Sequence, residues 1–258
     1  SKSSSQGFFY IIYHCKTRLT FFYSYKSTFK FKFFYYQFMA YLVNNFLNLL
    51  TTVVRKVSYW GLKNIVTFIF YELIYYFKFN SKTLFGVRNK ELDYELKKEE
   101  EFIEYIPTPY FLLYKSLKKI NLKIADISLV DFGSGAGRVL EFFIDRNIKF
   151  AKGVEMSKNL TNISKLNLSK YDNVVILNID AQDYRITQED NLFFLYDPFG
   201  AETVKKVIKN INNSLKEKSR KINIIYISPR HRDYFETNFG IIYKDINKYN
   251  LGIVIYSN

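Results

Sequence analysis

The 258-residue chain has few of the side chains that metal centres and disulfide frameworks require. It contains one cysteine, Cys15, and two histidines, His14 and His231. A single cysteine cannot form an intrachain disulfide or a cysteine zinc cluster, and two histidines are too few for a histidine-rich metal site. We therefore expect no bound metal, and the composition is compatible with a reducing compartment.

Acidic residues are absent from the first 71 positions. That segment holds nine Lys and Arg residues and no Asp or Glu, so it carries nine of the 14 net positive charges. The rest of the chain has 29 basic and 24 acidic side chains and is only mildly basic. This balance argues against an extended nucleic-acid groove, because neutralising phosphates requires clustered Lys and Arg side chains.

Residues 1–38 form a low-complexity extension in which basic side chains alternate with Phe and Tyr, as in the run 29–36. Three interpretations remain open. The segment has the composition of an organelle transit peptide, it suits a membrane surface with anionic lipid, or it is a disordered extension of a native protein that starts at Met39. We expect a cytoplasmic protein, with peripheral membrane contact or organellar import as the alternatives.

Long hydrophobic runs are also lacking. The two most apolar runs, 46–54 and 65–71, are both shorter than the roughly 20 residues that a membrane-spanning helix needs. Both have apolar residues at helical spacing, and Glu72 follows the second run. We predict that the segment 39–104 forms amphipathic helices that pack on the following domain; interfacial membrane contact is the alternative.

The most informative segment is 129–138, in which an apolar strand runs into a glycine turn that opens a helix. Asp131 precedes glycines at positions 133, 135 and 137, and Glu155 ends the next predicted strand, 151–155. Such a turn lets backbone approach a nucleoside ligand, and the strand-end acid accepts hydrogen bonds from ribose hydroxyls. The dinucleotide pattern G-x-G-x-x-G would place its third glycine where this chain has Arg138, so a nicotinamide-dependent enzyme is disfavoured.

The rest of the chain alternates between predicted helices and strands. Helices are predicted at 109–120, 156–169 and 201–215, and strands at 174–178, 191–196, 222–228 and, as a C-terminal hairpin, within 240–256. This alternation predicts a doubly wound α/β fold with a mostly parallel sheet.

The D-x-G-x-G-x-G pattern, with its following acidic strand end, resembles motif I of the class I S-adenosylmethionine-dependent methyltransferases. The resemblance spans about 129–256, and it is closest to an uncharacterised bacterial group with a G-x-G-R-V-L loop and an (N/D)-P-F motif. The upstream segments 85–88 and 105–110 fit the same group. The resemblance implies a methyltransferase domain over 105–258, with a Rossmann-like seven-stranded sheet, a C-terminal antiparallel hairpin and N-terminal helices.

The resemblance also implies S-adenosyl-L-methionine as the cofactor. The cofactor-binding residues that we predict on this basis are Thr108, Asp131, Gly133, Ser134, Gly135, Gly137, Arg138, Glu155, Asp180 and Ala181. Glu155 would hold the ribose, and Asp180 with Ala181 the adenine; a solvated strand-end Glu155 and an Asp180 that only satisfies loop amides are the alternatives. Asp197 and Pro198 are the predicted catalytic residues, which position the methyl acceptor.

The motif at 197–200 bears on the acceptor. Methyltransferases that act on amino groups often have Asp/Asn-Pro-Pro-Tyr here, but this chain has Phe199 and Gly200 in place of the second proline and the aromatic residue. The aromatic ring that stacks on a flipped base is therefore missing from its usual place. We expect a protein amine or a small metabolite rather than a DNA base as acceptor. The alternative is a non-catalytic, membrane-associated protein that binds S-adenosylmethionine.

Overall fold

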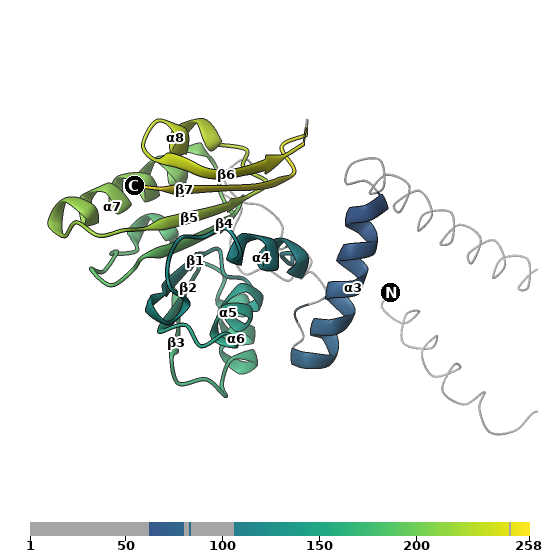
Figure 1. The fold of residues 1–258 in the computed structure, drawn as a ribbon. Coiled ribbons are helices and arrows are strands. Elements are labelled where there is room, and N and C mark those ends of the chain that lie inside the picture. Colours follow the sequence, from purple (N-terminus) through teal and green to yellow (C-terminus); the bar gives the residue numbers. More distant parts are fainter. Residues whose placement is uncertain (1–61, 80–82, 84–105, 248) are drawn as a thin grey trace, which may run out of the picture. The chain divides into compact units, whose positions relative to one another are not determined.

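The structure is a computed structural model that describes residues 62–79, 83, 106–247 and 249–258 (Figure 1). The chain divides into two compact units at Arg55, and the first unit lies outside the described residues. The predictions for the extension 1–38, the apolar run 46–54 and the segment 85–88 also lie outside them.

A seven-stranded sheet with the order β3-β2-β1-β4-β5-β7-β6 forms the centre of the second unit. β1 to β5 are parallel to one another, whereas β7 is inserted antiparallel between β5 and β6. The strands are β1 (Ser128–Phe132), β2 (Phe150–Glu155), β3 (Val174–Asn178), β4 (Leu192–Tyr196), β5 (Asn223–Ile227), β6 (Gly240–Ile246) and β7 (Gly252–Ser257). The predicted doubly wound sheet with its C-terminal antiparallel hairpin is confirmed.

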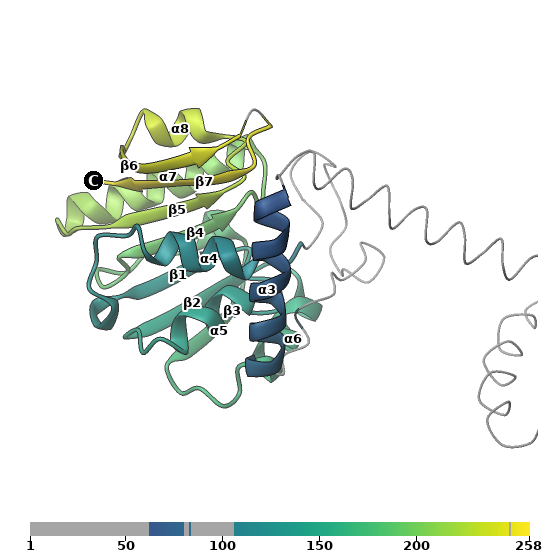
Figure 2. The same ribbon diagram turned by 45° about the vertical axis from the view of Figure 1, so that its right-hand side comes forward.

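Helices cover both faces of this sheet (Figures 1 and 2). They are α3 (Leu62–Phe79), α4 (Tyr110–Leu117), α5 (Arg138–Ile144), α6 (Lys158–Asn167), α7 (Ala201–Glu217) and α8 (Arg232–Glu236), with short 3-10 helices η2 (Ile124–Asp126) and η3 (Ala181–Asp183). Side chains of α3, α4 and α5 share one hydrophobic cluster, and those of α7 and α8 share another.

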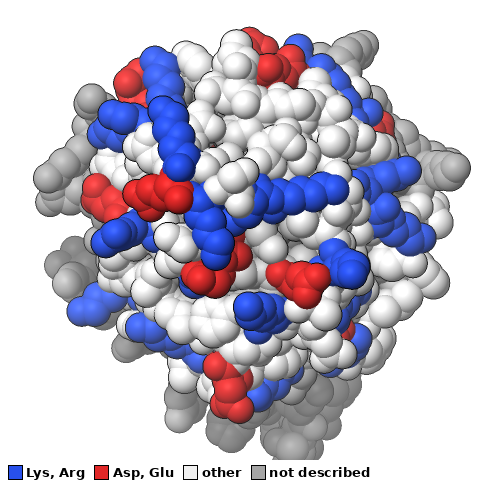
Figure 3. Space-filling model, turned by 60° about the vertical axis from the view of Figure 1, so that its left-hand side comes forward, with Lys and Arg blue, Asp and Glu red and all other residues white. Residues whose placement is uncertain are grey.

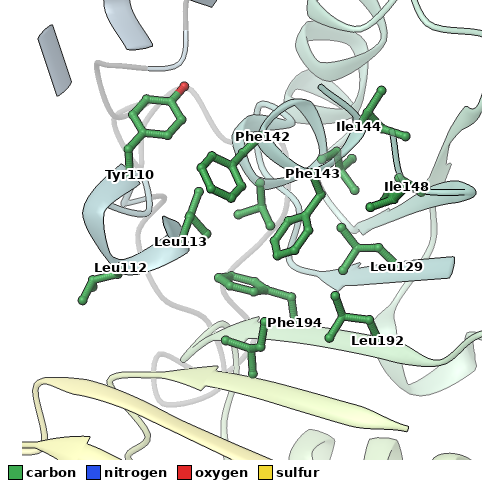
Figure 4. Packing of buried hydrophobic residues seen from close by; sticks show 14 of the residues in the cluster. Tyr110, Leu112, Leu113, Leu129, Phe142, Phe143, Ile144, Ile148, Leu192 and Phe194 are labelled. Atoms are coloured by element: carbon green, nitrogen blue, oxygen red, sulfur yellow. The ribbon is translucent and has the colours of Figure 1, made fainter. Parts of the chain in front are cut away.

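The central strands supply side chains alternately to the two clusters. Leu129 of β1 belongs to the cluster under α4 and α5, whereas Val130 and Phe132 belong to the cluster under α7. This period of two is inherent in a strand, and burial on both faces explains why the parallel strands are apolar throughout. Figure 4 shows Phe142 and Phe143 of α5 packed above Leu129.

The N-terminal helix α3 packs through one aromatic stripe. The Tyr75 ring lies 4.4 Å from that of Tyr110 in α4 and 5.6 Å from that of Phe142 in α5, measured between ring centroids. Tyr75 and Phe79 are buried. The helix predicted from the run 65–71 is therefore present and packs on the sheet domain, as expected for an amphipathic helix.

Candidate functional site

A pocket of about 250 Å³ opens at the carboxyl ends of β1, β2 and β4. This is where open parallel sheets bind their ligands. Its walls include ten of the twelve predicted site residues: Thr108, Asp131, Gly133, Ser134, Arg138, Glu155, Asp180, Ala181, Asp197 and Pro198. Gly135 and Gly137, which lie between Gly133 and Arg138 in the turn, do not line it.

The glycine turn adopts a backbone conformation that other residues rarely take. Gly133, Gly135 and Gly137 have φ angles of 74°, 53° and 86°, in the left-handed region that favours glycine. The Gly133 N–H donates to the Val154 carbonyl at 2.9 Å, which attaches the turn to β2. A Cβ atom on Gly133 would lie 2.6 Å from the Pro198 Cβ, so the turn packs directly against the segment after β4.

Glu155 fixes the same turn from the end of β2. Its Oε2 accepts a hydrogen bond from the Gly135 N–H at 2.9 Å, and its Oε1 accepts one from the Ser157 N–H at 2.8 Å. The side chain is buried and lines the pocket. The structure thus gives Glu155 a defined role in shaping the loop from a position in the pocket wall.

Asp131 is a buried carboxylate that lacks a hydrogen bond at one oxygen. It is 2% exposed, and its Oδ2 has no hydrogen-bond partner among the described residues. Asp190, at the other end of the sheet, is equally buried but accepts hydrogen bonds from Lys152 Nζ, the Tyr184 hydroxyl and the Thr187 N–H. Burial, and then the charge of Glu155, raises the pKa of Asp131 well above its usual value. An unsatisfied buried carboxylate in a pocket wall is suited to a cationic or hydrogen-bond-donating ligand.

Arg138 is the only basic residue among those that line the pocket. Its side chain is buried, and its guanidinium forms an ion pair with Glu72 of α3. The guanidinium also lies 3.8 Å from the centroid of the Tyr110 ring. Its Nε has no hydrogen-bond partner within the part of the chain that the structure describes. The residue predicted as a cofactor ligand therefore also connects the pocket to the N-terminal helix.

Asp180 stabilises the loop after β3 through side-chain hydrogen bonds. It caps η3, because its Oδ1 accepts a hydrogen bond from the Gln182 N–H at 3.0 Å and its Oδ2 accepts one from Gln182 Nε2 at 2.8 Å. This is the arrangement that the alternative interpretation of Asp180 expected. Asp180 and Ala181 nevertheless line the pocket, so their predicted contact with adenine stays a prediction.

Asp197 lies opposite the glycine turn, in a strained backbone conformation. Its φ is 39°, which is unusual for a residue other than glycine and often marks a functional site. Its Oδ1 accepts a hydrogen bond from the Tyr226 hydroxyl at 3.1 Å, and its Oδ2 lies 3.4 Å from Arg230 Nε. Burial raises the pKa of Asp197, while Arg230 and the Tyr226 hydrogen bond oppose that rise.

Several pocket residues were not predicted from the sequence. Tyr196 and Ser228 line the pocket at the ends of β4 and of the adjacent β5, and Ser228 also has a positive φ, 48°. Burial raises the pKa of Tyr196, and its hydrogen bond to Ser228 opposes the rise. A polar residue directly after each apolar strand was the available signal, because parallel strands end at one edge of the sheet.

Comparisons with known proteins found similar structures but no similar sequences. No family model matches the sequence, and no curated protein sequence is significantly similar to it. Among solved structures, a putative methyltransferase from Escherichia coli is 16% identical, with 57% of this chain and 86% of that chain covered and a TM-score of 0.46. A SAM-dependent methyltransferase from Aquifex aeolicus is 13% identical, with coverages of 56% and 88% and a TM-score of 0.44.

A third solved structure is an RNA methyltransferase from Salinibacter ruber in complex with S-adenosyl-L-homocysteine. It is 18% identical, with 59% of this chain and 92% of that chain covered and a TM-score of 0.42. The sheet of the present chain has the strand order 3-2-1-4-5-7-6 with an antiparallel β7. This strand order with an antiparallel β7 is typical of class I S-adenosylmethionine-dependent methyltransferases, and the chain therefore has their fold.

Proposed function

We propose that the chain is a methyltransferase that uses S-adenosylmethionine and acts on a protein amine or a small metabolite. The charge of the pocket supports this most directly. Three carboxylates line it, those of Glu155, Asp180 and Asp197, beside the buried carboxyl group of Asp131, and its one basic side chain is already paired with Glu72. A sulfonium nucleoside with an ammonium group carries net positive charge and suits such a pocket, whereas a dinucleotide pyrophosphate would be repelled.

The unsatisfied atoms of the pocket fit the amino-acid end of this cofactor. Asp131 Oδ2 and Arg138 Nε are both buried and have no hydrogen-bond partner in residues 62–79, 83, 106–247 and 249–258. A carboxylate and a guanidinium N–H match an ammonium and a carboxylate respectively. We assign the turn at 133–137 to the amino-acid end of the cofactor, Glu155 to the ribose hydroxyls, and Asp180 with Ala181 to the adenine, since all of these segments contribute to the pocket wall.

When bound, the cofactor supplies an already activated methyl group on a sulfonium. The task of the chain is then to hold an acceptor in line with that methyl, and such alignment contributes strongly to rate. Asp197 is suited to it, since Tyr226 and Arg230 fix its carboxylate at the pocket wall. A carboxylate whose pKa is raised by burial is also a better proton acceptor for an amine that loses a proton.

The surface and the motif after β4 support the acceptor class. On the face in Figure 3 acidic side chains lie among the more numerous basic ones, which partly offsets the positive potential that a nucleic-acid surface requires. Phe199 is only 6% exposed and belongs to the hydrophobic cluster under α7. Phe199 also lines the pocket, but the following position, where base methyltransferases often carry the stacking aromatic ring, is Gly200.

Calorimetry with purified full-length chain tests the cofactor assignment. We expect binding of S-adenosylmethionine and S-adenosylhomocysteine, and loss of both in Gly135→Asp, which adds a carboxylate beside Glu155. NAD serves as the control ligand. Tight binding of NAD, or unchanged binding of S-adenosylhomocysteine by the variant, would contradict the assignment. Transfer of tritiated methyl into lysate separated into protein, RNA, lipid and small molecules then identifies the acceptor class.

A second candidate, a non-catalytic cofactor-binding protein at a membrane surface, is favoured by the outer side of α3. Large apolar side chains are exposed there: Val66, Ile69, Phe70, Leu73, Ile74, Tyr76 and Phe77. The nine basic and no acidic residues of 1–71 would suit anionic lipid. No helix among the described residues is long and apolar enough to cross a bilayer.

Sedimentation with lipid vesicles separates the two candidates. The second candidate requires binding to vesicles that contain phosphatidylserine, weaker binding to pure phosphatidylcholine, and loss of binding in the double variant Phe70→Ser with Phe77→Ser. It also requires that no lysate fraction accepts methyl. Methyl transfer by a chain that stays in the supernatant would reject it.

A further inference from the structure

The first residue of α5 is anchored to a helix far upstream in the chain. Arg138 follows Gly137 directly, and its guanidinium forms a buried ion pair with Glu72 of α3. It also donates a hydrogen bond to the Thr83 carbonyl at 3.4 Å and lies over the Tyr110 ring. The side chains of Arg138 and Glu72 are at most 10% exposed, so water screens their interaction little.

Glu72 also holds the segment that forms another wall of the pocket. Its Oε1 accepts a hydrogen bond from the backbone N–H of Tyr110 at 3.0 Å. Tyr110 begins α4, two residues after Thr108, which lines the pocket. One carboxylate therefore joins the helix start after the glycine turn to the segment around Thr108, although Glu72 itself does not line the pocket.

An exposed contact between the same two helices provides a comparison. Lys78 of α3 forms an ion pair with Asp145, the residue directly after α5, at 2.5 Å. The Lys78 side chain is half-exposed, and neither residue lines the pocket. Exposed pairs of this kind contribute little to stability, whereas removal of one partner from a buried pair leaves a charge that nothing compensates.

We propose that Glu72 is a positioning residue for the cofactor site and that α3 is therefore a functional part of it. Glu72 holds Arg138 and Tyr110 in the geometry that binds S-adenosylmethionine, without touching the ligand. The inference rests on the proposed function, since it names a further determinant of the same site.

Calorimetric titration of the full chain with S-adenosylhomocysteine tests the role of Glu72. Glu72→Gln is nearly isosteric and can still accept from the Tyr110 N–H, but it does not neutralise Arg138. We expect its Kd to rise about tenfold, within the roughly 5–150-fold range of typical couplings between sites. The matched control Lys78→Met should stay within about twofold of the wild type, because its pair is exposed.

Hydrogen exchange on ligand-free protein gives a second measurement. In the native turn the Gly133 N–H donates to Val154 and the Gly137 N–H donates to Ser134. We expect these amides to exchange faster in Glu72→Gln and at the wild-type rate in Lys78→Met. Only the first change removes the charge that holds Arg138 at the start of α5, beside these amides. Glu72→Asp, which keeps the charge but is one methylene shorter, should fold readily and show an intermediate effect in both measurements.

Three results would overturn the inference. They are equal Kd values for the wild type and Glu72→Gln, an equal loss of affinity in Glu72→Gln and Lys78→Met, or unchanged rates of amide exchange in the turn of both Glu72 variants. A wild-type chain that does not bind S-adenosylhomocysteine would instead refute the proposed function. In that case the exchange rates of the ligand-free protein still decide whether Glu72 positions the turn.

Discussion

The contact between the glycine turn and the segment after β4 gives a quantitative prediction. In Gly133→Ala the new Cβ atom would lie 2.6 Å from the Pro198 Cβ, at a position where φ is 74°. A left-handed alanine costs about 1–2 kcal/mol. Carbon atoms pack at about 3.5–4 Å, so turn or proline must move by about 1 Å. Overpacking of this kind costs about 1–3 kcal/mol.

The combined penalty of about 2–5 kcal/mol can appear in two measurements. If the turn keeps its conformation, the free energy of unfolding falls. If the turn moves away from Pro198, it loses its fit to the ligand, and the Kd for S-adenosylhomocysteine rises by tenfold for every 1.4 kcal/mol or so. Urea unfolding measures the loss in the free energy of unfolding, and calorimetry on the same protein measures the loss in binding free energy. The two losses should together reach at least about 2 kcal/mol.

Gly240→Ala is the matched control. A Cβ atom on Gly240, which begins β6, would meet only the Ser257 carbonyl oxygen, at an ordinary 3.5 Å. We expect stability and ligand affinity within about 0.5 kcal/mol of the wild type, as for most mild surface changes. If Gly133→Ala behaves like Gly240→Ala in both assays, the turn does not pack on Pro198 as described.

Two further predictions concern carboxylates of the pocket. Because burial and Glu155 raise the pKa of Asp131 well above its usual value, the folded state holds this proton more tightly than the unfolded state, and the stability of the wild type should fall as pH rises from about 4 through the folded-state pKa. Asp131→Asn should remove this fall in stability, raise the Tm at pH 7 and weaken the binding of S-adenosylmethionine. Thermal unfolding at several pH values measures the first two effects, and calorimetry measures the third. A Tm at pH 7 below that of the wild type would contradict this prediction. Asp197→Asn should lower the rate of methyl transfer by about 100-fold, as for loss of a positioned proton acceptor, yet leave the Kd for S-adenosylhomocysteine nearly unchanged; the tritium assay with the identified acceptor decides, and equal rates would remove Asp197 from the mechanism.

The sequence predicted the sheet because its central strands are buried on both faces. β1 and β5 are completely buried and β4 almost so, and each appears as a short apolar run bounded by turn residues. The predicted strands 191–196 and 222–228 differ from the observed ones by only one residue at either end. The glycine pattern likewise located the pocket, since glycine at a positive φ reflects a local requirement of the backbone.

The interactions between distant residues could not be predicted in this way. Arg138 and Glu72 are 66 positions apart, and the sequence around either residue does not predict which residue it pairs with. Tyr226 bonds to Asp197 only because β4 and β5 are neighbours in the sheet. Its position inside an apolar strand predicted a core residue and gave no sign that its hydroxyl donates a hydrogen bond to Asp197.

The ion pair between α3 and α5 determines how far the protein can be shortened. A fragment that starts at residue 105 would retain all seven strands and every residue that lines the pocket. It would nevertheless lose Glu72, the ion-pair partner of Arg138, and expose the rings of Tyr110 and Phe142 on which Tyr75 packs; burial of one large apolar side chain contributes about 1.5–3 kcal/mol. Because domains of this size are stable by only about 5–15 kcal/mol, such a fragment would fold marginally, and the smallest robust unit for crystallisation or screening starts before Leu62.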